Sequence, residues 1–324
     1  PAWKEGVTRG SIVYAVNDDE NITVGYNGSN LNQADVRRVG TKLEAALEAN
    51  SLKLKLKTAS GEDKVFTLGY ENSYDIDPVI LDSVYVYPDK NIGYLAYSSF
   101  EEVWPSTHQN YVKLEEIFNS FTDANIKDLI LDLRYNTGGY VNTAEYLANK
   151  MIDAKSDKEL MFTYTVNDYL QPYTITPSSD IDFRPVYFKR KNNLNLENVY
   201  FLVTEQTASA AELLISVLKP YLNVILIGEE MQKNDGTKYS KTYGKPVGFF
   251  GQEIGKDNIE LWATSFKTEN NVRNPSDRLF RDYWEGLPVT YYDKINDYIF
   301  KDFGDSEEDM IAKALNLAGV PTSG

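Results

Sequence analysis

The chain has 324 residues, enough for one large domain or two ordinary ones with a substantial buried core. Hydrophobic residues make up 42% of it and aromatic residues 13%, which excludes a disordered tail and indicates a globular protein. With 33 Lys and Arg against 48 Asp and Glu, the net charge of −15 repels a phosphate backbone and an anionic membrane surface. We therefore exclude a nucleic-acid partner.

Residue types that build many hydrolase and metal sites are scarce. The chain has no cysteine, and His108 is its only histidine. A thiol nucleophile, a structural zinc site and a disulfide framework are therefore excluded, and a Ser-His-Asp triad could be built only around His108. Residues 104–108 (WPSTH) are typical of a helix start, and a lone surface histidine is far more common than a catalytic base. The remaining way to activate a serine is a lysine, and we expect no metal and no cofactor.

Residues 1–72 are predicted to form a small domain. A short strand at 11–16, a helix at 35–50 and a β-hairpin at 52–68 follow one another. Polar residues at 71–78, ending in an Asp-Pro step, predict a linker to a second domain at 73–324.

The second domain alternates apolar runs with amphipathic segments. Helices are expected at 109–121, at 141–152 and from Leu213 onward. Strands are expected at 84–87, 92–97, 129–134, 199–203 and 224–227. Strands followed by helices predict an α/β fold with a largely parallel sheet.

Ser209 lies between the strand at 199–203 and the following helix, in the sequence TEQTASAAE. Backbone N–H groups at a helix N-terminus are unpaired, so an oxyanion forming beside Ser209 would meet donors already in place. The same residues also form a capping box, in which Glu212 reaches back to the N–H of Ser209. On these residues alone the capping box is the more frequent arrangement.

Two other stretches could complete a site. Gly138 and Gly139 precede a helix, where a glycine turn lets the backbone approach a ligand closely, although such turns are more often simple turn chemistry.

Lys245 stands between Gly244 and Pro246 and is followed by apolar residues. A lysine base must be neutral, which requires burial worth roughly 3 pKa units, or about 4 kcal/mol. The lysines at 233–241 lie in a polar run typical of a solvated loop.

Together these stretches resemble the C-terminal processing, or tail-specific, serine peptidases. LILDLRYNTGGY (129–140), LVTEQTASAAE (202–212) and IGE followed by KTYGKPVG (241–248) occur in that family's order, and NIGYLAYSSF and GDSEEDMIAKALN are also similar to it. The resemblance implies a crotonase-like α/β peptidase core, a PDZ domain that presents substrate tails, and a Ser-Lys dyad.

The family's functional residues match positions of this chain. Ser209 matches the nucleophile, Lys245 the general base and Glu212 an acidic residue that supports the dyad. The N–H groups of Gly139 and Ala210 match the oxyanion hole, with Gly138 the less favoured neighbour of Gly139.

Three departures from the family pattern stand out. The family's G-E-K-T-x-G-K segment is split by a polar insertion at 230–241, which leaves Lys233 as an alternative base. Ala211 stands where many members have a second serine. Residues 1–70 resemble only the latter part of a PDZ domain, with Ser11 in place of the usual Asp, so we expect a partial PDZ-like unit that starts inside a longer protein.

We therefore predict a serine endopeptidase that cleaves unstructured proteins or C-terminal tails through an acyl-enzyme. Two alternatives stay open, namely an inactive peptidase-like protein that binds peptide or glycan, and a crotonase-type acyl-CoA enzyme. Five aromatic residues could line a substrate groove, although each is more often a core residue: Tyr135, Tyr140, Phe249, Phe250 and Trp262. No run of 18 apolar residues predicts a membrane span, and the resemblance implies a bacterial protein that is periplasmic or lipid-anchored.

Overall fold

The computed structural model describes residues 7–28, 30–58, 61–70, 76–178, 181–255, 259–297 and 301–320. The chain divides into two compact units, Pro1–Ile76 with Tyr298–Asp305, and Asp77–Asp297 with Ser306–Gly324. The sequence placed the boundary between residues 72 and 73 and did not predict that a C-terminal segment joins the first unit. Most of the predicted linker, residues 71–75, lies outside the described residues, as does the start of the chain.

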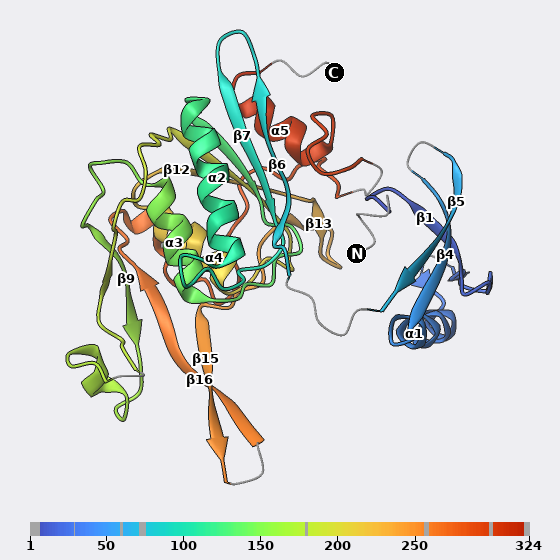
Figure 1. Ribbon diagram of the computed structural model, residues 1–324, viewed down its shortest axis with the longest axis horizontal. Coiled ribbons are helices and arrows are strands. Elements are labelled where there is room, and N and C mark those ends of the chain that lie inside the picture. The colour runs from blue at the N-terminus through green and yellow to red at the C-terminus, as the bar shows by residue number, and fades with distance from the viewer. Residues whose placement is uncertain are drawn as a thin grey trace. The chain divides into compact units, whose positions relative to one another are not determined.

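The described residues of the first unit form one helix and a three-stranded antiparallel sheet in the order β1-β4-β5 (Figure 1). Leu54 pairs with Phe66 across the hairpin that β4 and β5 form, as the alternation of apolar and polar residues predicts. Asn32 caps the helix by accepting the N–H of Ala34. Its elements are β1 (Ile12–Val16), β2 (Tyr26–Asn27), β3 (Asn30–Leu31), α1 (Gln33–Leu47), β4 (Ser51–Lys57) and β5 (Asp63–Gly69).

A five-stranded sheet in the order β12-β11-β8-β7-β6 forms the centre of the second unit (Figure 1). The first four strands of this order are parallel to one another, and β6 adds to the edge in the antiparallel direction. The strands are β6 (Val79–Val86), β7 (Asn91–Tyr97), β8 (Asp128–Asp132), β11 (Asn198–Val203) and β12 (Asn223–Gly228). The predicted α/β fold with a largely parallel sheet is confirmed.

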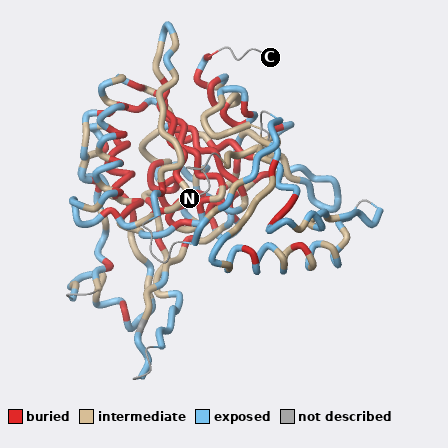
Figure 2. Tube along the Cα trace, turned by 45° about the vertical axis from the view of Figure 1, so that its right-hand side comes forward, coloured by how far each residue is buried: buried red, intermediate tan, exposed pale blue. Residues whose placement is uncertain are grey.

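Helices cover both faces of this sheet. Leu129, Leu131 and Phe201 pack in one apolar cluster with residues of α2 (Gln109–Asp123), α3 (Val141–Met151) and α4 (Ala210–Leu218). Neighbouring strand residues point to the opposite face, where α5 (Asp309–Leu317) lies against β11 and β12. Figure 2 shows the buried residues concentrated in these layers. Each fully buried side chain of this size stabilises the fold by roughly 1.5–3 kcal/mol, so the long apolar runs dictate the layering.

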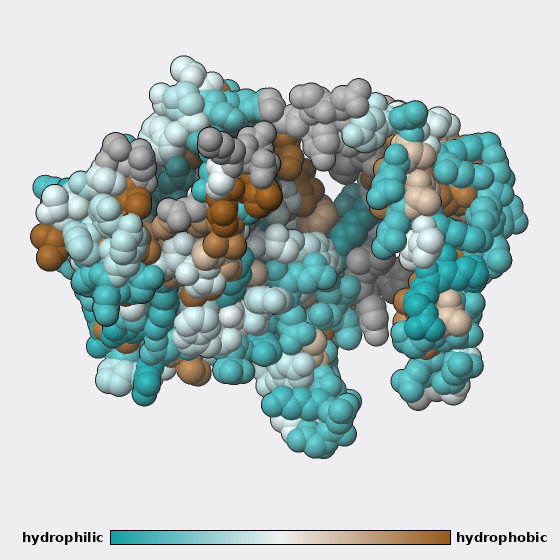
Figure 3. All heavy atoms as spheres, turned by 90° about the horizontal axis from the view of Figure 1, so that it is seen from below, coloured by the Kyte–Doolittle hydropathy of each residue, from teal (hydrophilic) through white to brown (hydrophobic). Residues whose placement is uncertain are grey.

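A second sheet, in the antiparallel order β10-β9-β16-β15, was not predicted from the sequence. Its strands are β9 (Leu160–Thr165), β10 (Val186–Tyr187), β15 (Val247–Ile254) and β16 (Ile259–Asn270), and the short helices η2 (Gln171–Thr174) and η3 (Pro275–Phe280) lie in the connections. Figure 1 shows the β15–β16 hairpin extending away from the helices of the unit. Figure 3, which views the side toward which the hairpin projects, shows exposed apolar side chains among polar ones.

The polar insertion at 230–241 is ordered as a small hairpin of β13 (Met231–Gln232) and β14 (Lys238–Tyr239). Lys238 Nζ lies 2.8 Å from a carboxylate oxygen of Glu230 and 3.4 Å from one of Asp293. The insertion therefore folds on itself and brings the chain back before Thr242.

Arg134 lies just after β8 and is only 2% exposed. Its guanidinium contacts the carboxylates of Asp132 at 2.6 Å, Glu308 at 2.6 Å and Asp297 at 3.0 Å. Breaking a buried ion-pair network of this kind costs about 3–5 kcal/mol. The network therefore fixes the start of the glycine turn to the C-terminal part of the unit.

Candidate active site

Ser209 has an unusual backbone conformation. It is the N-cap of α4, with φ 58° and ψ −118°. N-cap residues normally have extended dihedrals, and a non-glycine residue held in a sparsely populated region costs about 1–3 kcal/mol. Glu212 accepts the Ser209 N–H at 3.0 Å, so the reciprocal contact of a capping box coexists with strain at the cap. Strain of this kind is concentrated at functional sites.

The glycine turn lies directly against Ser209. A Cβ on Gly138, whose φ is 102°, would lie 2.7 Å from the Cβ of Ser209 and 2.8 Å from the carbonyl oxygen of Ala208. A Cβ on Gly139 would lie 2.3 Å from the carbonyl oxygen of Phe100. Because all three distances are shorter than real Cβ contacts, only glycine allows these backbones to approach so closely.

Hydrogen bonds join the three stretches that the sequence singled out. The Ala208 N–H donates to the carbonyl of Asn136 at 3.0 Å, and the Tyr243 N–H donates to the carbonyl of Thr207 at 3.0 Å. The Thr207 hydroxyl donates in turn to the carbonyl of Leu133 at 2.9 Å. The glycine turn that contains Gly138 and Gly139, the turn that carries Ser209 (the serine turn) and the loop that carries Lys245 (the lysine loop) are therefore joined by hydrogen bonds.

Glu212 is fully buried at the centre of this structure. Its carboxylate accepts the N–H groups of Ser209 at 3.0 Å, Gly244 at 2.8 Å and Lys245 at 2.8 Å, as well as the Thr242 hydroxyl. Burial raises the pKa of Glu212 above its ordinary value of 4.5, and these hydrogen bonds oppose the rise. One carboxyl group thus fixes the backbone on both sides of the site.

The amide groups of the two turns differ in what they contact. The Gly138 N–H donates to Asn136 Oδ1 at 2.9 Å. Within the described part of the chain, the N–H groups of Gly139 and Ala210 have no acceptor. Gly139 and Ala210 therefore have N–H groups available for a ligand, whereas that of Gly138 is already used.

Lys245 and Ser209 line the same cavity. Lys245 is half-buried, and its Nζ lies 4.7 Å from the centre of the Phe249 ring, a cation–π contact. Lys233, the alternative base, lies on the inserted hairpin with its Nζ 5.5 Å from the centre of the Tyr239 ring and does not line this cavity. His108 caps α2, with Nδ1 accepting the N–H of Asn110 at 3.2 Å.

The cavity has a volume of about 950 Å³. Its lining residues come from the glycine turn, α3, β9, the segment before β10, the turn at Ser209, the loop at Lys245 and the β15–β16 hairpin: Thr137, Gly139, Tyr140, Val141, Asn142, Tyr164, Ile181, Asp182, Phe183, Ser209, Lys245, Gly248, Phe249, Phe250, Gly251, Trp262 and Phe266. An apolar cavity with a few polar groups is typical of a ligand site.

Four of the five aromatic residues considered for a groove line this cavity, so the expectation that each belongs to the core is wrong for them. Tyr140 is 51% exposed, Phe249 39% and Trp262 62%. Tyr135 is the exception, because its hydroxyl donates to Asp297 and it does not line the cavity. The sequence did not indicate Tyr164, Phe183 and Phe266 as site residues. Tyr164 and Phe266 lie on strands of the unpredicted second sheet, and Phe183 lies in the connection between β9 and β10.

Comparison with known proteins agrees with this geometry. Residues 91–246 match the family model of peptidase family S41, a range that contains the glycine turn, Ser209 and Lys245. The family resemblance predicted from the sequence is confirmed.

Two similar proteins illustrate the match. The chain is 26% identical over 271 residues to the carboxy-terminal processing protease CtpA of Bacillus subtilis (strain 168), covering 80% of this chain and 50% of that protein. The chain thus spans half the length of that relative. A candidate S41 protease from Bacteroides fragilis NCTC 9343 has the same fold, with a TM-score of 0.70, 23% identity, and coverage of 99% of this chain and 76% of that one.

None of the helices in the described ranges has both the length and the apolar character that crossing a membrane requires.

Proposed function

We propose that this chain is a serine endopeptidase that forms an acyl-enzyme on Ser209, with Lys245 as the general base. The observation that carries this proposal is the Glu212 carboxylate, which accepts the N–H groups of both Ser209 and Lys245. The two side chains line one cavity, and Ser209 has the strained backbone typical of a positioned nucleophile. The match of residues 91–246 to a peptidase family also supports peptide-bond hydrolysis.

The reaction follows from these positions. Neutral Lys245 accepts the hydroxyl proton of Ser209 as the Ser209 oxygen bonds to the scissile carbonyl carbon. The carbonyl π electrons move to oxygen, and the N–H groups of Gly139 and Ala210 stabilise the oxyanion. Collapse of this intermediate breaks the C–N bond, and the leaving amine takes the proton from Lys245. Water then attacks the ester, Lys245 again moves the proton, and the acid is released.

The substrate is a polypeptide in an extended, unstructured form. The cavity is bordered by the backbone of β15, an edge strand of the second sheet, and aromatic side chains such as Tyr140 and Trp262 supply apolar contact area. The relative from Bacillus subtilis is named as a carboxy-terminal processing protease, which favours C-terminal tails as the substrate. We place the enzyme outside the cytoplasm, periplasmic or lipid-anchored, and assign the first unit as a partial PDZ-like domain that presents tails.

Cleavage of a disordered protein tests the proposal. We expect the wild type to cut casein, and Ser209→Ala and Lys245→Ala to be inactive with the fold intact by circular dichroism. Lys233→Ala is the matched control, because this lysine lies outside the cavity and should keep wild-type activity. Loss of activity in Lys233→Ala together with activity in Lys245→Ala would overturn the assignment of the base. A wild type that binds casein without cutting it would instead identify a binding protein.

A further inference from the structure

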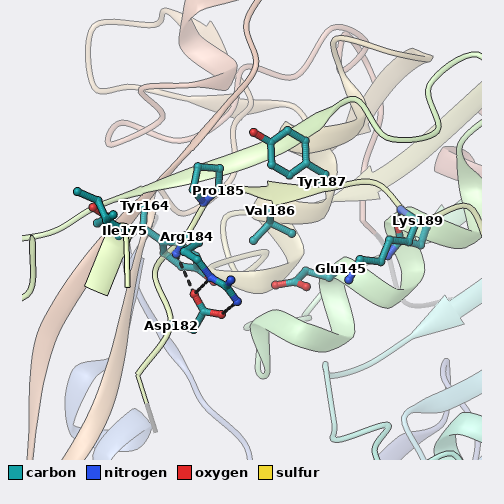
Figure 4. Close-up of a pocket in the computed structure, with 11 residues that line it drawn as sticks. Glu145, Tyr164, Ile175, Asp182, Arg184, Pro185, Val186, Tyr187 and Lys189 are labelled. Carbon is teal, nitrogen blue, oxygen red and sulfur yellow. Dashed lines mark hydrogen bonds and ion pairs between the residues drawn. The ribbon is translucent and has the colours of Figure 1, made fainter. Parts of the chain in front are cut away.

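A second cavity, of about 740 Å³, adjoins the one that contains Ser209. Tyr164 and Asp182 line both cavities, so the two lie side by side. Its walls are α3, β9 and the segment around β10, and Figure 4 shows the side chains that project into it. A polypeptide bound near Ser209 can therefore place one of its side chains in this second cavity.

Glu145 supplies a carboxylate to this second cavity from α3. The first turn of α3, one turn before Glu145, contributes Val141 and Asn142 to the cavity of Ser209. Figure 4 shows the carboxylate directed into the space between α3 and the segment that carries Asp182 and Arg184. Among the described residues, no hydrogen bond or ion pair reaches this carboxylate. Burial raises the pKa of Glu145 from 4.5 to about 7.

The surrounding charges leave Glu145 without a close counter-ion. The Arg184 guanidinium binds the Asp182 carboxylate through two nitrogens, at 2.9 and 2.7 Å, so these two charges compensate each other. Lys189 attracts Glu145 but is exposed and makes no ion pair with it in the described structure. The other titratable groups of the cavity are the phenols of Tyr164 and Tyr187. A largely buried carboxylate without a donor is costly, and a ligand that brings a cation relieves that cost.

We propose that the second cavity is a substrate subsite for a Lys or Arg side chain, with Glu145 as its counter-ion. This proposal rests on the proposed peptidase function. An apolar side chain would leave the carboxylate buried and unpaired. An acidic side chain would be repelled by Glu145. The enzyme therefore prefers a basic residue at one fixed position relative to the cut bond.

A positional scan tests this subsite. A peptide that the enzyme cuts is resynthesised with Lys or norleucine at each position in turn, and kcat/KM is measured for the wild type. We expect one position at which Lys is preferred about tenfold or more, and this ratio should fall to near one in Glu145→Gln. Glu145→Lys should instead favour Glu at that position. Glu116→Gln, an exposed carboxylate on α2, is the matched control and should keep the preference.

The same ratio has a pH dependence of its own. Since Glu145 ionises near pH 7, the preference for Lys should increase by up to about tenfold between pH 6 and pH 8, and Glu145→Gln should show no increase. A pH dependence of the chemical step that is common to both peptides cancels in the ratio. An enzyme that cuts the peptides but shows no position with a Glu145-dependent preference for Lys would overturn the subsite.

Binding separates failure of the subsite from failure of the peptidase. Fluorophore-labelled peptides that carry Lys or norleucine at each position in turn are titrated with Ser209→Ala. Their dissociation constants, measured by fluorescence anisotropy, are compared with those of the double variant that also carries Glu145→Gln. Tighter binding of the Lys peptide that needs Glu145 supports the subsite even if the wild type cuts nothing, in which case only the proposed activity fails. Equal binding of the two peptides contradicts the subsite.

Discussion

Oε2 of Glu212 accepts the backbone N–H of Lys245 at 2.8 Å, and the same oxygen accepts the N–H of Ser209 at 3.0 Å. Two segments far apart in the sequence are thus positioned by one atom. The inserted hairpin between them does not disturb this contact, because the chain returns before Thr242, whose hydroxyl donates to the other oxygen of Glu212.

Replacing Glu212 should therefore damage stability and activity together. Glu212→Gln puts an NH₂ group where N–H donors now point, so buried donors lose their acceptor. We expect the free energy of unfolding to fall by about 2–4 kcal/mol and activity to fall by about 100-fold or more. Urea denaturation and casein cleavage measure the two effects, with Glu116→Gln as the control. A Glu212→Gln enzyme with wild-type activity would show that the contact does not position the dyad.

The pH–rate profile tests the lysine base. A lysine accepts a proton only in its neutral form, so kcat/KM should rise from pH 6 to pH 9. Lys245→Arg keeps the positive charge and the length of the side chain but stays protonated, and we expect it to lose activity by about 1,000-fold at every pH. A profile that falls above pH 7, or an active Lys245→Arg enzyme, would be incompatible with this role.

The two turns at Ser209 should not tolerate a methyl group between them. Gly138→Ala places its Cβ within 2.9 Å of three atoms of residues 208–210 at a φ of 102°, so we expect both the fold and the nucleophile to be disturbed. Gly255→Ala is matched, because its φ is also positive, at 74°, but its Cβ would meet no atom within 4 Å. Gly255→Ala should cost only about 1 kcal/mol, whereas Gly138→Ala should cost clearly more and abolish cleavage. Equal effects of the two substitutions on activity would argue against the steric role of Gly138.

Glu145 should make stability depend on pH. Its pKa rises from 4.5 in the unfolded chain to about 7 in the fold, so the folded state favours the protonated form. The resulting stabilisation is present at low pH and is lost as pH rises through 7. Gln does not titrate, so Glu145→Gln removes this loss. The free energy of unfolding of the variant minus that of the wild type should therefore be about 1–3 kcal/mol larger at pH 8 than at pH 5. Urea denaturation at the two pH values measures the difference, and an equal effect at both would contradict a buried, titrating Glu145.

The elements that carry Ser209 and Gly139 could be predicted because their determinants are local. An apolar run, a short turn and an amphipathic segment follow one another at 198–218 and again at 128–151, and the structure has strands and helices there. The predicted lysine loop also lies beside Ser209, although a hairpin separates it from the preceding strand.

Other features depend on contacts between distant residues. The pairing of Thr268 with Tyr164 joins β16 to β9 across about a hundred residues, and no local pattern specifies it. Apolarity alone could not tell that Phe250 and Trp262 line a cavity rather than the core, since that depends on the same sheet. The ion pairs of Arg134 with Asp297 and Glu308 are equally non-local.

Covalent labelling shows directly whether Ser209 is the nucleophile and whether Lys245 activates it. The wild type, Ser209→Ala and Lys245→Ala are treated with a serine-reactive fluorophosphonate, and the adduct is located by mass spectrometry of proteolytic peptides. If Ser209 is the nucleophile and Lys245 its base, we expect one adduct, on Ser209 of the wild type, and no adduct in Ser209→Ala. Labelling of Lys245→Ala should be slower by about 100-fold or more. An enzyme that cuts casein but carries its adduct on another residue, or labels equally fast without Lys245, would contradict these roles.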